Sequence, residues 1–328
     1  MTCPYGAESA PMDTRLEALS GSQGGVFAAH EALAAGLTRA YLHQALRARK
    51  LVRVRRGAYV HATVWQAASP DERYRLGCLA VARSRPGDAL SHHAALAVLG
   101  LSLWGHDVGR IDLVTDTVQS VRRGSVWLHP DDGVAVASVA DAACVSPARA
   151  VVRTALTMGK DCAVVAGDAA LHRGLVTLAD LMTEVAAISP HQGRGRAMEA
   201  VLLMDSRSES VGESRTRLAL RCLGFQPDSQ VVLRDSDGRF VARVDLVVDG
   251  VVLEFDGLVK YARQRDAEDG APDPEEVVWL EKRREDAIRR LGHPVERVIW
   301  NELERPGLIG ARVRSAKVLV TARVPRPA

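Results

Sequence analysis

The sequence has few aromatic residues and little lysine, and it has no cysteine pair spaced to bind zinc. Zinc ribbons and thiol redox sites need Cys-x-x-Cys pairs, and secreted disulfide scaffolds are dense in paired cysteines. The cysteines here are odd in number and widely spaced, at Cys3, Cys78, Cys144, Cys162 and Cys222. We therefore expect a reducing, cytoplasmic setting without structural disulfides or cysteine-bound zinc.

Long apolar runs are also missing from the sequence. No stretch of about 18 uncharged apolar residues occurs, and the first residues, MTCPYGAESAPMD, lack a basic segment followed by an apolar one. We expect a chain that neither crosses a membrane nor leaves the cell. The formal net charge of +3 is too small to indicate a nucleic-acid partner, so only local clusters of arginine can do so.

The composition that is present is that of a globular protein, with 47% hydrophobic and 25% charged residues. A length of 328 residues indicates two or three domains of about 150 residues each. We predict an α/β multidomain protein with disordered termini at residues 1–13 and 323–328. Its three parts are a winged helix-turn-helix at 14–66, a mainly helical middle region at 67–205 and a mixed α/β domain at 206–322.

The first part carries the pattern of helix, turn, helix and hairpin. A helical pattern over residues 28–35 stops at Gly36, and Thr38 can cap a second helix. Residues 51–60 alternate and break at Gly57, as a small β-hairpin does. A helix-turn-helix followed by a basic hairpin is the layout of a winged helix, whose second helix enters the major groove of DNA.

Basic and polar side chains cluster on this helix and hairpin, where such folds meet DNA. The predicted DNA-binding residues are Thr38, Arg39, His43, Arg47, Arg49, Lys50, Arg53, Arg55 and Arg56. The alternative is that these arginines only solvate a small helical domain. The region resembles the N-terminal domain of AbiEi-type antitoxins in GGVF (24–27), AAGLT (34–38) and VRRGAYV (54–60). That resemblance implies a winged helix that binds operator DNA.

The middle part shows helical periodicity at 71–82, 91–99, 146–158 and 161–185, with one strand at 110–115. Its segments SHHAALAVLGL (91–101) and SPARAVVRTAL (146–156) extend the resemblance to AbiEi-type antitoxins, with Arg153 where the relatives usually carry Asp. Ser91, His92 and His93 suggest hydrolase chemistry, but adjacent helical residues point about 100° apart and cannot share a ligand as an i, i+4 pair does. We predict a structural role for them.

In the last part, Asp249 and Gly250 predict a type I′ hairpin turn, which needs positive φ at both residues. The turn pairs Val248 with Val251, Leu246 with Leu253, Asp245 with Glu254 and Arg243 with Asp256. One face is then apolar and predicted to be buried, with Ala242, Val244, Leu246, Val248, Val251, Leu253 and Phe255. The opposite face gathers the acids.

Carboxylates directly opposite each other on neighbouring strands repel, and Arg243 alone is an incomplete counterion for three acids. A Mg²⁺ ion bound between these carboxylates would compensate their negative charges, so the pattern predicts a metal site. The alternative is a solvated sheet face with an arginine salt bridge.

At this hairpin the chain resembles the PD-(D/E)XK nuclease superfamily, near the very-short-patch repair endonucleases. The resemblance covers about 206–304 and rests on SVGESR (210–215), on Asp245 with LEFDGLVKY (253–261), on WLEKRRED (279–286) and on ERVIW (296–300). It implies a restriction-endonuclease-like fold, in which helices flank a mixed sheet. It also implies that Asp245 and Glu254 bind Mg²⁺ or Mn²⁺ and that Glu213 completes the site.

The sequence departs from that superfamily at one position, because Asp256 stands where the third motif residue is usually Lys. Lys260 and Lys282 are the candidates to place a positive charge near the developing phosphate charge. Asp256 can be a further ligand or can orient the lysine. The predicted catalytic set is Glu213, Asp245, Glu254, Asp256, Lys260 and Lys282.

The leading hypothesis is a Mg²⁺-dependent endonuclease that a winged helix delivers to double-stranded DNA. The alternative is a repressor or antitoxin-like DNA-binding protein with an inactive nuclease fold, and a third hypothesis is an RNA-directed nuclease. The sequence leaves open whether the protein works as a homodimer or with a toxin or defence-system partner.

Overall fold

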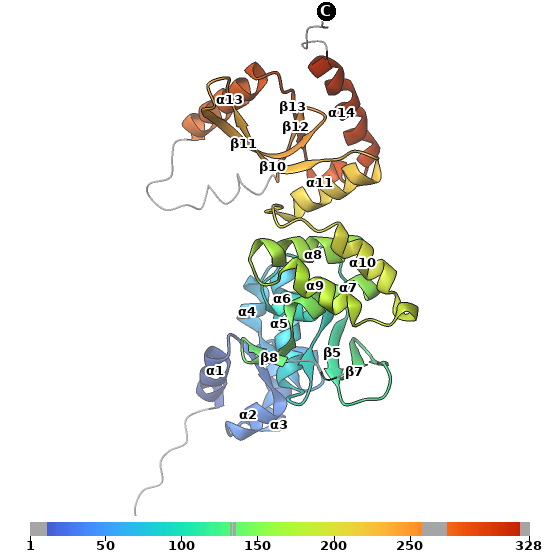
Figure 1. The fold of residues 1–328 in the computed structure, drawn as a ribbon. Coiled ribbons are helices and arrows are strands. Elements are labelled where there is room, and N and C mark those ends of the chain that lie inside the picture. Colours follow the sequence, from blue (N-terminus) through green and yellow to red (C-terminus); the bar gives the residue numbers. More distant parts are fainter. Residues whose placement is uncertain (1–11, 132, 134–135, 258–273, 322–328) are drawn as a thin grey trace, which may run out of the picture. The chain divides into compact units, whose positions relative to one another are not determined.

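The computed structural model describes residues 12–131, 133, 136–257 and 274–321. The chain divides into an N-terminal unit, Met1–Gly159 with Thr183–Gly193, and a C-terminal unit, Lys160–Met182 with Arg194–Ala328. Figure 1 shows the helices and strands, coloured along the sequence. This division differs from the sequence-based boundary near residue 205. The described strands form three sheets, so the protein is α/β at the level of class. None of the described helices is long and apolar enough to cross a membrane.

Most residues of the termini predicted to be disordered lie outside the described residues. Met12 and Asp13 are exceptions, because they begin the helix α1 (Met12–Ser22). Leu16 of α1 is buried in a core with Phe27, and the Asp13 carboxylate binds Lys50 at 2.9 Å. The prediction of disorder is therefore wrong for these two residues, since burial and an ion pair hold this helix in place.

The first part of the N-terminal unit contains the helices and the hairpin that the sequence predicts. Gly36 takes a φ of 82° at the end of the first predicted helix, and Thr38 Oγ1 accepts a hydrogen bond from the Tyr41 amide at 3.1 Å to cap the next. Gly57 turns the hairpin with a φ of 83°. The strands form an antiparallel sheet in the order β1-β3-β2. The elements are β1 (Val26–Ala28), α2 (Ala29–Ala34), α3 (Arg39–Arg47), β2 (Leu51–Arg55), β3 (Ala58–His61) and α4 (Ala62–Ala67).

The rest of the N-terminal unit contains a six-stranded sheet that the sequence analysis missed. Its described strands run in the order β6-β7-β5-β4-β9-β8, with β5 parallel to β7 and β4 parallel to β9. The strand predicted at 110–115 is confirmed as β5. The prediction that the middle region is mainly helical is correct only in part, because this region also contains the other five strands of the sheet. The other strands are two to five residues long, too short to show a clear alternation. The strands are β4 (Ala89–Leu90), β5 (Ile111–Thr115), β6 (Val121–Arg123), β7 (Val126–Pro130), β8 (Val136–Val139) and β9 (Ala142–Val145).

The helices predicted along the middle of the sequence are present. Those at 71–82, 91–99 and 146–158 are confirmed, and α6 packs against α5, α7 and β5. The pattern at 161–185 is divided between two helices, because Gly174 takes a φ of 65° between them. The elements are α5 (Pro70–Arg83), α6 (His92–Val98), α7 (Pro147–Thr157), α8 (Lys160–His172), α9 (Leu178–Ala186), η1 (Pro190–Gln192) and α10 (Arg194–Leu202).

A mixed four-stranded sheet lies at the centre of the C-terminal unit as described. The strand order is β10-β11-β12-β13, antiparallel except for β12 and β13, which are parallel. The helices α11 and α14 contact β12, whereas α13 contacts β11 and β13. The elements are α11 (Val211–Cys222), β10 (Asp228–Arg234), β11 (Phe240–Val248), β12 (Val251–Phe255), α13 (Pro274–Arg290), β13 (Val295–Val298), η2 (Trp300–Glu302) and α14 (Pro306–Thr321).

The hairpin of β11 and β12 has the predicted turn and register. Asp249 and Gly250 both take positive φ, at 50° and 82°, and Leu246 pairs with Leu253. The predicted apolar residues are buried, apart from the partly buried Phe255, but they belong to two clusters rather than to one core. Leu246, Val248, Val251 and Leu253 pack with residues of α11 and α14, whereas Ala242, Val244 and Val252 pack with Ile288 of α13. Helices thus cover both faces of this sheet, and only a sheet with one solvated face shows a clean alternation.

Candidate nucleic-acid and metal sites

Helix α3 presents a stripe of basic side chains. Arg39, His43 and Arg47 are exposed and recur every four residues, which places them on one face of the helix. Leu42 and Ala45 on the other face are buried. His43, Leu46, Arg47 and Arg53 line an open depression of about 550 Å³, so α3 and β2 together form a basic concavity.

The other predicted DNA-binding residues differ in what they contact. Thr38 caps α3, and Lys50 forms an ion pair with Asp13 at 2.9 Å, so both already have partners in the chain. Arg49 and Arg56 are exposed. Arg55 is half-buried, and burial, followed by the nearby Arg85 and Arg123, lowers its pKa. The exposed arginines are therefore the ones available to a phosphate.

In the C-terminal unit, four polar residues form one row across the sheet, one from each strand. They are Gln230, Asp245, Glu254 and Arg297. Between β10 and β11, Ser229 pairs with Leu246 and Val231 with Val244, so Gln230, whose φ is 53°, and Asp245 lie between the same two pairs. Asp245 and Glu254 directly adjoin the pair Leu246–Leu253 along β11 and β12. Glu254 and Arg297 are paired directly between β12 and β13. The carboxylates predicted to face each other thus come from adjacent strands.

Each acid of this hairpin contacts a donor or a cation. Oδ2 of Asp245 accepts a hydrogen bond from the Phe255 amide at 2.9 Å. Oε1 of Glu254 lies 2.7 Å from Nη2 of Arg284 on α13, and Oδ2 of Asp256 lies 3.8 Å from Nη1 of Arg297. Arginines from α13 and β13 therefore lie beside the carboxylates whose charge was expected to be compensated by a metal ion.

Glu213, the predicted helix acid, is connected to the row through Gln230. Its side chain is 8% exposed and accepts hydrogen bonds from Ser210 Oγ at 2.9 Å, the Glu209 amide at 3.0 Å and Gln230 Nε2 at 2.9 Å. Gln230 lies on β10, the strand that pairs with β11 on both sides of Asp245, so these contacts join the start of α11 to the acidic row. Gly212 permits this approach, because a Cβ there would lie 2.1 Å from the Phe255 ring.

The structure describes only one of the two predicted lysines. Lys260 lies outside the described residues, and Lys282 is exposed on α13. Among the described acids, Glu213, Asp245 and Glu254 do not form a group whose oxygens all lie within reach of a single ion. The one cluster of the described chain that could hold a metal ion is elsewhere, in the N-terminal unit.

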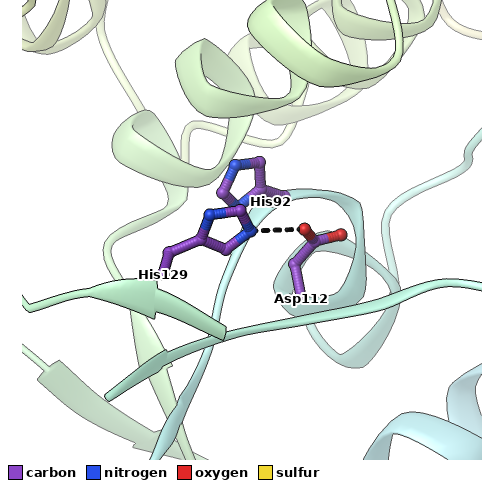
Figure 2. Close-up of side chains that lie close together, drawn as sticks. All are labelled: His92, Asp112 and His129. Atoms are coloured by element: carbon purple, nitrogen blue, oxygen red, sulfur yellow. Dashed lines mark hydrogen bonds and ion pairs between the residues drawn. The ribbon is translucent and has the colours of Figure 1, made fainter. Parts of the chain in front are cut away.

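That cluster consists of His92, Asp112 and His129 (Figure 2). His92 begins α6, Asp112 lies on β5 and His129 on the adjacent parallel strand β7. One ligand atom from each residue lies within 4.8 Å of the other two. Nε2 of His129 is 2.6 Å from Oδ1 of Asp112, and the His92 and His129 rings stack with centroids 4.4 Å apart. Three separate segments thus meet in one group of ligand types.

The surroundings of His92 and Asp112 favour the forms of these two groups that bind metals. Asp112 is 0% and His92 4% exposed. Burial lowers the pKa of His92 well below its usual value, so the ring is neutral. Burial opposes the ionisation of Asp112, but the hydrogen bond with His129 and the nearby His92 and Arg110 outweigh it and lower the pKa of this carboxyl group. A neutral imidazole and a carboxylate are the forms that coordinate metals.

The neighbours of His92 in the sequence, Ser91 and His93, do not reveal this cluster. Its partners Asp112 and His129 come from β5 and β7 instead. One signal was available. Asp112 stands between apolar residues in a predicted strand, the same pattern that drew attention to Asp245.

No protein-family model matches this sequence, and no curated protein matches it. The chemistry of each candidate site therefore follows from its own residues and distances.

Proposed function

We propose that this protein binds double-stranded DNA through α3 and the β2–β3 hairpin and hydrolyses phosphodiester bonds at the hairpin of β11 and β12, with Mg²⁺ or Mn²⁺ as cofactor. The observation that carries the proposal is the row of Gln230, Asp245, Glu254 and Arg297, to which Glu213 is joined by Gln230. Acids from a helix and two adjacent strands, beside a cation, are the parts that a phosphodiester hydrolase needs.

The DNA-binding half of the proposal rests on α3 and its surroundings. The order of α2, α3 and the hairpin is the order expected for a winged helix, and α3 carries the exposed stripe of Arg39, His43 and Arg47. Arg53 on the hairpin lines the same depression as Arg47. Guanidinium groups on a helix and a neighbouring strand can bind phosphates on either side of a groove.

For the catalytic half, Asp245, Glu254 and Glu213 are the residues that would hold the ion, after a side-chain movement that brings together their oxygens, which do not converge in the described structure. Carboxylate oxygens suit Mg²⁺, and Asp245 and Glu254 lie on the adjacent strands β11 and β12. When bound, the ion polarises the scissile phosphate and lowers the pKa of the attacking water. Binding requires Arg284 to release Glu254, which leaves that guanidinium beside the row. Lys260 and Lys282 remain the proposed lysines for the developing negative charge.

The test is cleavage of supercoiled plasmid by the full chain with Mg²⁺ or Mn²⁺. Asp245→Asn and Glu254→Gln remove a ligand charge at nearly constant volume and should each abolish nicking. Asp249→Asn is the matched control, because Asp249 lies in the same hairpin but pairs with Lys317 at 2.9 Å, and Asn-Gly also forms this turn. Equal nicking by all four proteins would point to a contaminating nuclease and refute the site.

One observation favours a second candidate, a DNA-binding regulator of the repressor or antitoxin type with an inactive nuclease fold. Arg284 already pairs with Glu254 and Arg297 lies near Asp256, so the acids have cations without a metal. For this candidate, the parent and both variants should be equally inert on plasmid while all of them retard duplex DNA in a gel. Nicking by the parent alone would exclude it.

A further inference from the structure

The cluster of His92, Asp112 and His129 lies in the N-terminal unit, away in sequence from the acidic row, and the proposed function does not use it. Its ligand atoms lie within 4.8 Å of one another, although the residues are far apart along the chain. We propose that these three side chains form a binding site for a divalent transition metal ion of the class that includes Zn²⁺. The inference is independent of the proposed nuclease.

The donor set selects the class of metal. Two imidazoles and one carboxylate suit Zn²⁺ and its transition-metal neighbours, whereas Mg²⁺ and Ca²⁺ prefer oxygen ligands alone. Three protein ligands also leave at least one coordination position for water or another small ligand, as in catalytic rather than structural zinc sites. The site therefore differs in metal class from the carboxylate row of the C-terminal unit.

The neighbours of the three residues orient them as the outer contacts of a metal site do. Nδ1 of His92 lies 3.0 Å from Ser91 Oγ, and Nδ1 of His129 lies 3.2 Å from Ser120 Oγ. A hydroxyl partner at Nδ1 fixes the ring and leaves the other nitrogen for coordination, an arrangement typical of metal-binding histidines. Arg110 holds the carboxylate of Asp112 through Nε and Nη2, at 2.6 to 3.0 Å.

The backbone at His92 adds a second, separate observation. Its φ is 51°, in the left-handed region that a non-glycine residue enters only at a cost in free energy. The neighbouring Ser91 amide donates a hydrogen bond to the Asp112 carbonyl at 2.9 Å, which holds the start of α6 against β5. This strained backbone therefore sits where α6 meets the strand that carries the carboxylate. Such strain recurs at functional sites, where the surrounding structure maintains it.

A hydrogen-bond network without an ion is the competing interpretation. In that network, Ser120 donates to Nδ1 of His129, and Nε2–H of His129 donates to Asp112, at the same heavy-atom distances. A test must therefore keep the hydrogen bond while removing the ligand. Gln at position 129 can still donate through its amide but coordinates metal poorly, and Asn at position 92 tolerates positive φ better than most residues.

The experiment uses the untagged full chain, stripped with a chelator and dialysed, and measures Zn²⁺ binding by calorimetry and elemental analysis. We expect one equivalent for the parent, and binding weakened at least about 100-fold in His92→Asn and His129→Gln, since each loses one of three ligands. His191→Ala, which removes an exposed histidine, and Asp245→Asn should bind as the parent does. These controls separate the site from surface histidines and from the acidic row.

Two measurements on the parent protein test the proposal even if a variant folds poorly. Co²⁺ added to the parent should give visible absorption that Zn²⁺ abolishes, and Zn²⁺ should raise the parent's thermal unfolding temperature, because a ligand that binds only the folded state stabilises it. Absence of bound Zn²⁺ in the parent, or equal binding by folded His92→Asn and His129→Gln, would overturn the proposal. Plasmid cleavage is scored separately, so either site can fail without the other.

Discussion

Asp168 and Arg217 form an ion pair with a 2.6 Å distance between Oδ2 and Nη2, and both side chains are only 1% exposed. The pair joins α8 to α11 within the C-terminal unit. Ser214 Oγ and the Asp205 amide donate to the same carboxylate, and Arg217 donates to the Leu203 carbonyl. The helix that carries Glu213 is therefore fixed by a buried charge network rather than by apolar contacts alone.

Removing one partner of this pair should strongly destabilise the unit. Arg217→Leu leaves the Asp168 carboxylate buried without its cation, and the expected loss in the free energy of unfolding is about 3 to 5 kcal/mol. Hydrogen exchange of the α8 and α11 amides in the full chain measures it. Arg221→Ala, on the exposed side of the same helix, should change exchange little.

A double variant refines this test. Asp168→Leu with Arg217→Leu replaces both charges by apolar groups, and it should recover part of the loss because no charge remains buried unpaired. Equal protection in the parent and in Arg217→Leu would show that the pair contributes nothing to the stability of α11.

Gly212 controls the approach of α11 to the acidic row. A Cβ at this position would lie 2.1 Å from Phe255, the residue between Glu254 and Asp256. Gly212→Ala should therefore displace that ring and cost about 1 to 3 kcal/mol of stability, as overpacking does. Any plasmid nicking should fall with it, because the backbone that carries both acids moves.

Gly195→Ala is the control for Gly212→Ala. Gly195 lies in helix α10, and an added Cβ there meets no atom within 4 Å. Alanine should stabilise that helix by up to about 1 kcal/mol, since glycine is the poorer helix former. The comparison uses thermal unfolding and nicking of the same preparations. If both alanine variants behave alike, close packing at Gly212 is not what positions the row.

Local chemistry explains which parts of this fold could be predicted. The Asp249–Gly250 turn is determined by two adjacent residues that tolerate positive φ, and the register of β11 and β12 follows from it. The stripe on α3 follows from a spacing of four residues. In both cases the signal lies within a short continuous segment of the chain, so tertiary contacts are not needed to predict it.

The rest depended on contacts between distant segments. Strand β4 has only two residues, so it carries no periodicity, yet it joins β5 and β9 in the six-stranded sheet. His92, Asp112 and His129 meet only because β5 pairs with β7 and because α6 packs against β5. The division of the hairpin's apolar residues depends on α13, whose position over β11 no spacing within the hairpin encodes.

DNA affinity should depend on the exposed arginines of the α3 depression. Arg47→Ala and Arg53→Ala each remove one positive charge from it and should weaken binding to all duplex sequences to a similar extent. If each arginine contacts a phosphate, the slope of log affinity against log salt concentration should fall by about 1 per substitution. Fluorescence anisotropy with labelled duplexes of unrelated sequence measures both quantities.

The control for DNA binding is Arg196→Ala, which removes an exposed arginine from α10 at the same change in net charge. Its salt dependence should match that of the parent. A uniform loss of affinity in all three variants would indicate that the effect comes from net charge. It would remove the support for α3 as the helix that binds DNA.

Tyr41 should titrate at unusually high pH. Its hydroxyl donates a short hydrogen bond to Asp13, and burial, followed by that bond and the negative charge of Asp13, raises its pKa to about 12. Because the pKa is raised in the folded state, the interaction contributes its full stabilisation below pH 10 and loses it as the pH rises through about 12. Ultraviolet absorbance of tyrosinate, compared between the parent and Tyr41→Phe, isolates this group.

Asp13→Asn should lower the pKa of Tyr41 toward its ordinary value, since the charge is gone while burial remains. An unchanged titration in Asp13→Asn would mean that burial alone sets the pKa and that α1 is not held to α3 through this contact.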